Sequence, residues 1–291
     1  MKNPSFNAET NLYCLIGNPV SHSLSSLMHN HAFQKLGLNA VYLAFKVEGN
    51  KLGEAIKGLR ALNIKGANIT IPYKTSVIEH LDIVDDTAKR IGAVNTVKNI
   101  NGKLVGYNTD WEAAVELLKE KAGKLQGKNA LIIGAGGVAR AILYGLLKNS
   151  VNVSITNRTM DKARLLTFEL KKHVGEKAEC TVLNPSEIRE KISDFQIIIN
   201  ATPLGMTPNI NKTPLNTEYL TSEIIVFDTV YNPLETLLIK KAKQKGCIII
   251  EGYRMLVKQG ALSFKLWTGI PPPETDMEKI VYMKLKGDLN E

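Results

Sequence analysis

Cysteine is scarce in this chain of 291 residues. It has only Cys14, Cys180 and Cys247, and no two of them stand in a CxxC pair. An odd number of isolated thiols fits buried side chains in a reducing cytoplasm better than a disulfide framework or a zinc site. His29 and His31 have no matching Cys/His cluster, so they are interpreted as helix residues and not as ligands. The sequence therefore predicts no bound metal.

Long uninterrupted apolar runs are also missing. The opening MKNPSFNAET has no apolar segment of the signal-peptide type. The longest apolar stretch, residues 131–147, is interrupted by Arg140 and contains several glycines. Such a stretch is typical of a buried strand, turn and helix, and not of a membrane span. We therefore expect a cytoplasmic protein with no membrane partner.

Basic residues outnumber acidic ones, 37 to 28, for a net charge of +9. The lysines are spread along the chain, and the densest run, residues 240–245, resembles the solvated end of a helix. No aromatic side chains alternate with basic ones as in base-stacking surfaces. We therefore expect no nucleic-acid partner and a small anionic ligand instead. The sequence leaves the oligomeric state open, with a homodimer as one possibility.

The first 110 residues mix short strands and helices. Strands are predicted at 11–17 and 66–72, and a hairpin joins 93–98 to 103–107 around Asn101-Gly102. Helical spacing runs from Leu27 to Leu36, with Gly37 as the expected stop.

From Lys128 onward, strands alternate with helical stretches, which indicates a doubly wound parallel sheet. An amphipathic helix at 111–121 is expected to join the two halves, and residues 254–267 are predicted to be helical again. The fold class is therefore α/β, with a doubly wound parallel sheet in the second half of the chain. We expect domains at 1–110, completed by 254–291, and at 111–253. The strands expected in the second domain are 129–133, 151–156, 179–182, 196–200, 224–228 and 247–250.

A glycine-rich turn carries the sharpest local signal. Gly134, Gly136 and Ala139 form a GxGxxA pattern directly after an apolar strand and directly before a helix. The first glycine permits a tight turn, the second lets a pyrophosphate approach the backbone, and the small third residue lets helix and strand pack closely. Free N–H groups at the helix start then face the phosphates. The pattern predicts a dinucleotide site.

The end of the next strand indicates which dinucleotide is bound. It carries Asn157-Arg158-Thr159 in place of the carboxylate that usually holds the ribose of NAD. A guanidinium and a hydroxyl would bind a 2′-phosphate, and Lys162 could add a second cation. NADP is therefore favoured over NAD. In the alternative interpretation Arg158 is a surface charge and Thr159 is the N-cap of the next helix.

Lys74 and Asp110 are candidates for proton transfer. Strand alternation sends Asn68 and Thr70 to one face of the predicted 66–72 strand, and Lys74 follows just past its end. Alcohol oxidation needs a group that accepts the hydroxyl proton, and a desolvated lysine can serve. Asp110 also has a plain structural explanation, because Thr109 and Glu112 fit a capping box at a helix start.

Serines cluster before the first predicted helix, in the segment Ser21 to Ser25. One of them is expected to be an N-cap. Several hydroxyl groups at a helix N-terminus would also make a cradle for a carboxylate.

These motifs, taken together and in order, resemble the shikimate dehydrogenase family of the shikimate/quinate dehydrogenase superfamily. The matching blocks span residues 17 to 261. They are GNPVSHSLS (17–25), NITIPYK (68–74), AVNT (93–96), GYNTD (106–110), GAGGVAR (134–140), NRT (157–159), NATPLGM (200–206), DTVYNPLET (228–236) and GYRMLVKQGA (252–261). The resemblance implies an N-terminal α/β substrate domain and an NADP-binding Rossmann domain with a cleft between them. It also implies the reaction of 3-dehydroshikimate with NADPH to give shikimate and NADP, in aromatic amino-acid biosynthesis.

The resemblance also implies roles for single residues. Lys74 and Asp110 would be the catalytic pair, and the substrate would be bound by Ser23, Ser25, Asn68, Thr70, Asn95, Tyr231 and Gln259. The pyrophosphate would lie on Gly134, Ala135, Gly136, Gly137 and Val138, and the 2′-phosphate on Asn157, Arg158, Thr159 and Lys162. The nicotinamide side would be formed by Thr202, Thr229, Gly252 and Met255, with Asp86 as a further cofactor candidate.

One departure and three alternatives remain. Ser26 stands where the family commonly has proline, which stiffens the first helical turn. A quinate or broader quinate/shikimate dehydrogenase, including one that uses NAD, is the nearest alternative, with the discriminating contacts around Ser23 and Thr70. A non-catalytic NADP-binding regulator is the second, because a fold does not dictate function. A folate-type methylene dehydrogenase ranks low, because the Ser23/Ser25 and Tyr231/Gln259 blocks match the shikimate pattern.

Overall fold

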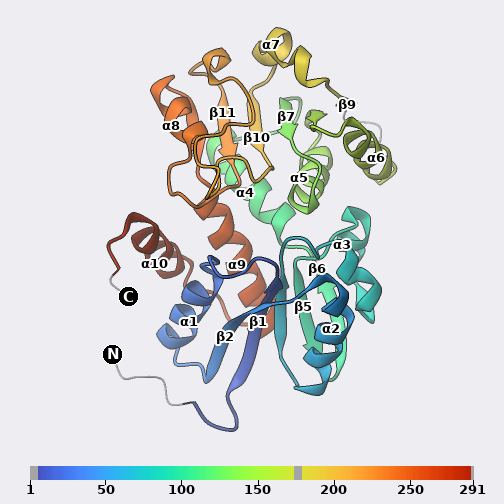
Figure 1. Cartoon of the computed structure of the whole chain (residues 1–291), viewed down its shortest axis with the longest axis vertical. Coiled ribbons are helices and arrows are strands. Elements are labelled where there is room, and N and C mark those ends of the chain that lie inside the picture. Colours follow the sequence, from blue (N-terminus) through green and yellow to red (C-terminus); the bar gives the residue numbers. More distant parts are fainter. Residues whose placement is uncertain (1–5, 174–178, 290–291) are drawn as a thin grey trace. The chain divides into compact units, whose positions relative to one another are not determined.

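The computed structural model describes residues 6–173 and 179–289, and the chain divides into two compact units (Figure 1). Unit 1 consists of residues 1–109 and 257–291, and unit 2 of residues 110–256. The sequence placed the first boundary one residue later and the second three residues earlier. The second observed boundary falls inside helix α9 (Gly252–Thr268), which no sequence pattern marks as a place of division.

Unit 1 contains a six-stranded mixed sheet in the order β2-β1-β3-β5-β6-β4. The pairs β1–β2, β1–β3 and β4–β6 are parallel, whereas β3–β5 and β5–β6 are antiparallel. Its strands are β1 (Asn11–Gly17), β2 (Ala40–Lys46), β3 (Gly66–Ile69), β4 (Ile83–Val84), β5 (Thr96–Ile100) and β6 (Lys103–Tyr107). Its helices are α1 (Ser25–Lys35), α2 (Leu52–Ala61), α3 (Asp86–Ile91) and α10 (Glu274–Lys286), with short 3-10 turns η1 (Gly49–Lys51) and η2 (Ser76–His80).

The two faces of this sheet differ because side chains alternate along each strand. On one face, Cys14, Ile16 and Ile69 pack with Ile56 of α2 and Val77 of η2 in a buried apolar cluster. On the other face, the rings of Tyr13 and Tyr42 lie near Trp267 of α9. Asn68, between two residues of the first cluster, hydrogen-bonds to Ser263 of α9. The polar side chain of Asn68 therefore faces α9.

Unit 2 contains a six-stranded parallel sheet in the order β12-β11-β10-β7-β8-β9. Its strands are β7 (Asn129–Ile133), β8 (Asn152–Thr156), β9 (Cys180–Val182), β10 (Ile197–Asn200), β11 (Ile225–Asp228) and β12 (Ile248–Ile250). Its helices are α4 (Asp110–Ala122), α5 (Gly137–Lys148), α6 (Met160–Lys171), α7 (Ile188–Lys191) and α8 (Leu237–Gln244), with 3-10 turns η3 (Pro185–Glu187), η4 (Ile192–Asp194) and η5 (Thr217–Tyr219). The order reverses direction at β7, the switch point of a doubly wound sheet.

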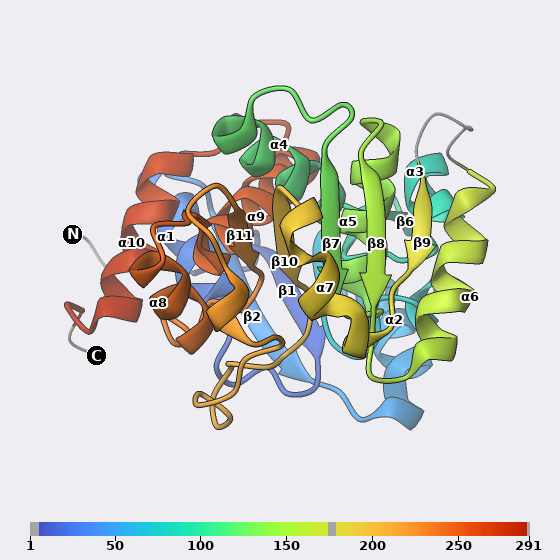
Figure 2. The ribbon, with the colours of Figure 1, turned by 90° about the horizontal axis from the view of Figure 1, so that it is seen from above.

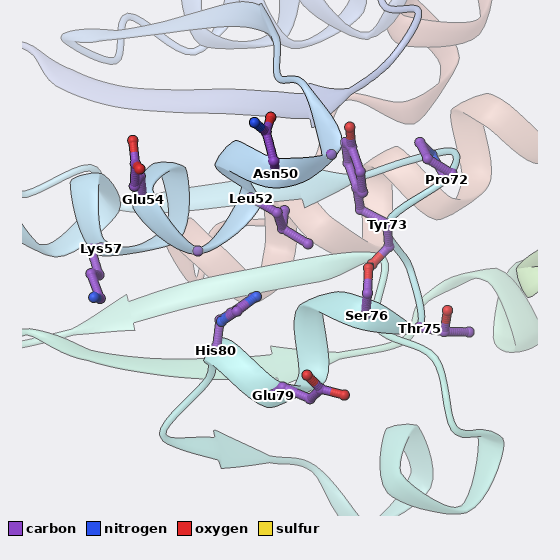
Figure 3. A pocket seen from close by; sticks show the side chains of 12 residues that line it. Asn50, Leu52, Glu54, Lys57, Pro72, Tyr73, Thr75, Ser76, Glu79 and His80 are labelled. Atoms are coloured by element: carbon purple, nitrogen blue, oxygen red, sulfur yellow. The ribbon is translucent and has the colours of Figure 1, made fainter.

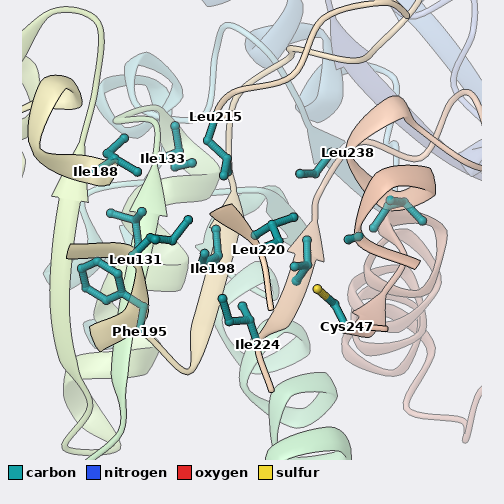
Figure 4. Close-up of a cluster of buried hydrophobic side chains, with 14 of the residues drawn as sticks. Leu131, Ile133, Ile188, Phe195, Ile198, Leu215, Leu220, Ile224, Leu238 and Cys247 are labelled. Carbon is teal, nitrogen blue, oxygen red and sulfur yellow. The ribbon is translucent and has the colours of Figure 1, made fainter. Parts of the chain in front are cut away.

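Helices cover the sheet of unit 2 on both faces. Figure 2 shows β7, β8 and β9 side by side, with α6 beside β9. Helix α5 packs on β7 and β8, whereas Ile188 of α7 and Leu238 of α8 cover the opposite face. There they pack on Leu131, Ile198 and other strand residues in one apolar cluster (Figure 4). The doubly wound arrangement expected from the sequence is confirmed.

Local predictions hold in most places. Asn101 and Gly102 both have positive φ in the β5–β6 hairpin, as a tight two-residue turn requires. Gly37 follows α1 in the left-handed region and ends that helix. The predicted 66–72 strand is too long, because β3 ends at Ile69 and the chain turns, with the Tyr73 N–H donating to the Thr70 carbonyl at 2.9 Å.

All three cysteines are free and buried. Within residues 6–173 and 179–289, no helix combines the length and the apolar composition needed to cross a membrane. The same residues contain no group of three or more His, Cys, Asp or Glu side chains placed to hold a metal ion.

Candidate active site

A buried polar cluster forms where β3, β5 and α9 meet in unit 1. The Asn68 side-chain amide lies at its centre and donates to the Asn95 carbonyl, the Thr96 hydroxyl and the Ser263 hydroxyl at 3.2, 3.2 and 3.1 Å. Thr96 and Ser263 also share a hydrogen bond of 2.8 Å. Each of these residues is buried. Since buried polar groups are stable only when paired, this network fixes the orientation of each amide and hydroxyl.

Asn95, Thr109 and Gln259 extend the cluster. The Asn95 amide nitrogen donates to the Thr109 hydroxyl at 2.9 Å and to the Gln259 side-chain oxygen at 3.2 Å. Its oxygen accepts the Thr109 N–H at 2.7 Å. Residues far apart in sequence are thereby joined, and three predicted substrate residues, Asn68, Asn95 and Gln259, share one network.

The serine segment differs from the prediction in its cap. Helix α1 begins at Ser25, and the N-cap position falls on Leu24, without a side-chain cap. The prediction of a serine N-cap is therefore wrong, because the register of the first turn places Ser23 one residue too early. The Ser23 hydroxyl instead donates to the Ser25 hydroxyl at 3.2 Å and accepts the Ser25 N–H at 3.3 Å. The two hydroxyl groups proposed for a carboxylate do lie together.

The loop after β3 carries Thr70 and Lys74, both half-buried. The Thr70 N–H donates to the Ile16 carbonyl at 2.9 Å, and the Lys74 carbonyl accepts the Val94 N–H at 2.7 Å. These backbone bonds hold the loop against β1 and the segment before β5. Asp110 is buried at the first position of α4. It lies in unit 2, whereas Lys74 lies in unit 1, so the pairing of the two stays a prediction.

A pocket of about 720 Å³ lies beside this loop in unit 1 (Figure 3). Pro72, Tyr73, Thr75 and Ser76, which flank Lys74 in sequence, form one wall, and residues of η1 and α2 form the other. None of the predicted substrate residues lines it. The pocket is therefore a neighbour of the loop and distinct from the polar cluster.

In unit 2, the glycine-rich turn has the geometry of a phosphate cradle. Gly134 follows β7 with φ of +122°, and a Cβ there would lie 2.7 Å from the Ala201 carbonyl oxygen. Only glycine fits such a position without strain. Gly136 is the N-cap of α5, and Ala139 is fully buried at the contact of helix and sheet. Ala135, Gly137 and Val138 complete the turn, so free N–H groups at the start of α5 are available to a pyrophosphate.

The residues after β8 fit a 2′-phosphate. Arg158, Thr159 and Lys162 are exposed, and Asn157 donates to the Thr159 carbonyl at 2.9 Å. Thr159 does occupy the N-cap of α6, but its side chain makes no capping hydrogen bond. A guanidinium, a hydroxyl and an ammonium group therefore face solvent where NAD-binding proteins usually carry an acid. Together with the Gly134 turn, this donor set fits NADP.

A buried carboxylate organises the strand ends next to this turn. Asp228, at the end of β11, accepts hydrogen bonds from the Asn200 amide (2.9 Å), the Val230 N–H (3.0 Å) and the Thr236 hydroxyl (2.6 Å). Burial raises the pKa of Asp228 to about 6, against the lowering effect of these three donors. The Asn200 oxygen in turn accepts from the N–H and the hydroxyl of Thr202 at 3.0 and 2.7 Å.

Other nicotinamide-side candidates lie on the same segments. The Thr229 N–H donates to the Asn200 carbonyl at 3.0 Å. Tyr231, predicted as a substrate residue, follows two residues later and so lies in unit 2. A Cβ on Gly252 would collide with the Val230 carbonyl, so only glycine lets α9 start this close to the loop. Met255 is buried in the same helix. Asp86 is different, because it is exposed at the start of α3 in unit 1, whereas every other cofactor candidate lies in unit 2.

Several residues of these networks were not predicted from the sequence. Asp228, Asn200, Thr109 and Ser263 were not chosen as site residues, although all but Ser263 lie inside the quoted motif blocks. Ser263 follows Gln259 by four positions and so shares its helix face, which is a usable signal. Tyr42, whose hydroxyl donates to the Asn68 side chain, lies in no sequence motif that would have marked it as a site residue.

These features define the class of two-domain NADP-dependent oxidoreductases. They are a glycine turn between β7 and α5 of a doubly wound sheet, exposed cations after β8, and a second α/β unit with a buried polar cluster. The chain belongs to the shikimate dehydrogenase family. Three family models match it: the shikimate dehydrogenase substrate binding domain at residues 15–97, shikimate / quinate 5-dehydrogenase at 116–228, and the shikimate 5′-dehydrogenase C-terminal domain at 252–282.

Similar proteins support this assignment over the whole length. The shikimate dehydrogenase (NADP(+)) of Methanococcus maripaludis is 44% identical over 279 residues, covering 96% of this chain and 98% of the relative. A crystal structure of a shikimate dehydrogenase in complex with NADP+ superimposes with a TM-score of 0.91 at 42% identity, covering 98% and 99% of the two chains. The quinate dehydrogenase of Corynebacterium glutamicum in complex with NAD has a TM-score of 0.87 at 30% identity, covering 94% and 99%.

Proposed function

We propose that the chain catalyses the reversible oxidation of shikimate to 3-dehydroshikimate with NADP, a step of aromatic amino-acid biosynthesis. One observation carries the proposal. The chain has both the exposed donor set for NADP in unit 2 and the buried polar cluster in unit 1, and its sequence aligns over 96% of its length with an NADP-dependent shikimate dehydrogenase. The cytoplasmic location stays a proposal as well, supported by free, buried cysteines.

The substrate side follows from the chemistry of the polar cluster. A carboxylate accepts hydrogen bonds, and the Ser23 and Ser25 hydroxyls at the start of α1 are donors that lie together. Ring hydroxyls both donate and accept, which suits the amides of Asn68, Asn95 and Gln259. In this proposal Thr70 and Tyr231 complete the set of substrate contacts.

Lys74 is proposed as the group that takes the proton from the reacting hydroxyl, with Asp110 as its partner. Oxidation removes a hydride from the carbinol carbon and a proton from its oxygen, so a positioned base speeds the step. In the reverse direction the same ammonium group returns the proton to the developing alkoxide. When bound, the nicotinamide of NADP supplies the hydride acceptor.

On the cofactor side, Gly134 to Val138 would hold the pyrophosphate, and Asn157, Arg158, Thr159 and Lys162 the 2′-phosphate. Thr202, Thr229, Gly252 and Met255 are proposed for the nicotinamide side, where the Asp228 network holds the loops. Asp86 is proposed as a further cofactor contact, from unit 1.

A quinate dehydrogenase activity is the second candidate, favoured by the similarity to the quinate dehydrogenase of Corynebacterium glutamicum. That protein is 30% identical to this chain, whereas the shikimate dehydrogenase (NADP(+)) of Methanococcus maripaludis is 44% identical to it. The deciding assay follows NADPH or NADH absorbance with shikimate or quinate, each with NADP or NAD. We expect the highest kcat/KM for shikimate with NADP. Preference for quinate or NAD supports the second candidate, and NADP binding without any turnover supports a regulator. Size-exclusion chromatography of the same sample decides whether the chain is a homodimer.

A further inference from the structure

Tyr42 lies in β2, the outer strand of the unit 1 sheet, and is fully buried. Its backbone is held by the side chain of Asn30 in α1. The Tyr42 N–H donates to the Asn30 oxygen at 2.7 Å, and the Asn30 amide nitrogen donates to the Tyr42 carbonyl at 2.9 Å. The amide thus takes the place of a neighbouring strand at an edge where backbone groups would otherwise be unpaired.

The ring of Tyr42 is held by the preceding residue of the same helix. His29 stacks on it with ring centroids 4.5 Å apart and an interplanar angle of 17°. His29 is itself fully buried. Because α1 clamps both the backbone and the ring, the phenol oxygen has a fixed position relative to that helix.

The phenol hydroxyl joins two parts of the proposed substrate site. It donates to the Asn68 side-chain oxygen at 2.8 Å. The Asn68 side-chain nitrogen in turn donates to three acceptors, on Asn95, Thr96 and Ser263. This arrangement opposes a flip of the Asn68 amide. Ser25 lies at the start of α1, the helix that holds Tyr42, and its hydroxyl accepts from the Ser23 hydroxyl. Tyr42 therefore links α1, which carries the serine pair, to Asn68.

Building on the proposed function, we propose that Tyr42 is a positioning residue that sets the carboxylate-binding serines of α1 in register with Asn68 and the ring-binding cluster. Burial raises the pKa of Tyr42 well above its usual range, so the phenol stays a hydrogen-bond donor throughout the working pH range. Tyr42 itself exchanges no proton with the substrate.

The test is Tyr42→Phe, which removes one oxygen atom and keeps the ring. Loss of the donor leaves the Asn68 oxygen buried without its partner, so we expect the KM and the dissociation constant for shikimate to rise roughly tenfold. We expect kcat and the KM for NADP to change less than about twofold, because the hydrogen bond is absent from the cofactor side. Steady-state kinetics and calorimetric titration with shikimate give these values.

Tyr13→Phe is the matched control. Tyr13 pairs with Tyr42 across β1 and β2, is buried, and lies in the same aromatic cluster, with its ring 5.2 Å from those of Phe33 and Trp267. Among the described residues Tyr13 makes no hydrogen bond to the Asn68 side chain, so the KM for shikimate should stay at the wild-type value. An equal rise in both variants would overturn the proposal in favour of a general packing effect.

A double-mutant cycle on the shikimate dissociation constant separates the hydrogen bond from a general packing effect. If Tyr42 acts through Asn68, Tyr42→Phe in an Asn68→Ala background should raise the shikimate dissociation constant less than about twofold. Full additivity overturns the proposal. A wild-type chain that neither binds nor oxidises shikimate would instead reject the proposed function. A wild-type chain that does both, with an unchanged Tyr42→Phe variant, rejects only the role of Tyr42.

Discussion

The side-chain amide of Asn200 donates a hydrogen bond of 2.9 Å to the buried carboxylate of Asp228. The two residues end the adjacent strands β10 and β11, and they are paired in register. Since Asn200 also holds Thr202, and Asp228 also holds the Val230 N–H, one carboxylate ties together two loops on the proposed nicotinamide side. Thr236, the N-cap of α8, is the third donor.

Replacing Asp228 should therefore affect both stability and cofactor binding. Asp228→Ala leaves three donors in a buried site without an acceptor, and we expect a loss of about 2–4 kcal/mol in the free energy of unfolding. The KM for NADP should rise more than the KM for shikimate. Asp228→Asn retains one acceptor oxygen and should lose less. Urea unfolding and steady-state kinetics measure these changes.

The control for Asp228 is Asp276→Asn, at an exposed residue of α10 whose carboxylate is 3.4 Å from Lys35. An exposed ion pair contributes little, so this variant should match the wild type within about 0.5 kcal/mol. Equal losses of unfolding free energy in the Asp228 and Asp276 variants would contradict a stabilising role of the buried hydrogen-bond network.

Arg158 is expected to select NADP over NAD. Arg158→Ala removes the guanidinium proposed for the 2′-phosphate, so the KM for NADP should rise about 10- to 100-fold, while the KM for NAD changes little. Kinetics with both cofactors at saturating shikimate measure the ratio. Arg164→Ala provides the control, because Arg164 lies in α6 and is paired with Asp161 at 2.9 Å on the exposed surface. A parallel loss for NADP and NAD would contradict the assignment.

Lys74 is expected to matter for the chemical step more than for binding. Lys74→Met keeps most of the side-chain stem and removes the ammonium group, so kcat should fall by about 10²- to 10⁴-fold. The dissociation constant for NADP should stay at the wild-type value, because the cofactor candidates of the glycine turn lie in unit 2. Lys89→Met, at an exposed position of α3, is the control and should retain full activity. Substantial turnover by Lys74→Met would show that another group moves the proton.

His29 should make stability depend on pH. Burial lowers the pKa of its imidazole to about 3, and both ring nitrogens lack a hydrogen-bond partner among the described residues. The neighbouring rings are Phe33, Tyr42, Phe264 and Trp267. Below a pH of about 6.5 the unfolded chain binds a proton that the folded chain refuses, so stability falls as the pH drops toward 3.

The effect of His29 can be isolated by comparison of variants. Between pH 7 and pH 5, we expect wild type to lose about 2 kcal/mol more unfolding free energy than His29→Phe, measured in urea. His31→Gln removes the other histidine of α1, which is only half-buried, and should keep the wild-type pH dependence. Identical pH profiles for wild type and His29→Phe would contradict a neutral buried imidazole.

Short-range chemistry made several features predictable. The Asn101-Gly102 hairpin, the stop at Gly37 and the Gly134 turn depend on residues that are adjacent in the chain and on backbone angles that few residue types adopt. The doubly wound sheet followed from a regular alternation of apolar strands and helices. The serine cap failed because the exact first residue of a helix depends on how that helix docks, and the 66–72 strand failed because its last residues turn after Ile69.

The sequence by itself determined the architecture of unit 2, its glycine-rich turn after β7, the assignment of NADP as cofactor and the resemblance to a dehydrogenase family, because each rests on local spacing or on motif order. Only the tertiary structure decided which polar groups meet. Asn68 and Ser263 are 195 residues apart, yet they hydrogen-bond at 3.1 Å, and Tyr42 reaches Asn68 across the sheet. Such contacts arise when α9 docks on the sheet and buries its polar residues, which must then find partners. No pattern along the chain encodes those pairings one by one.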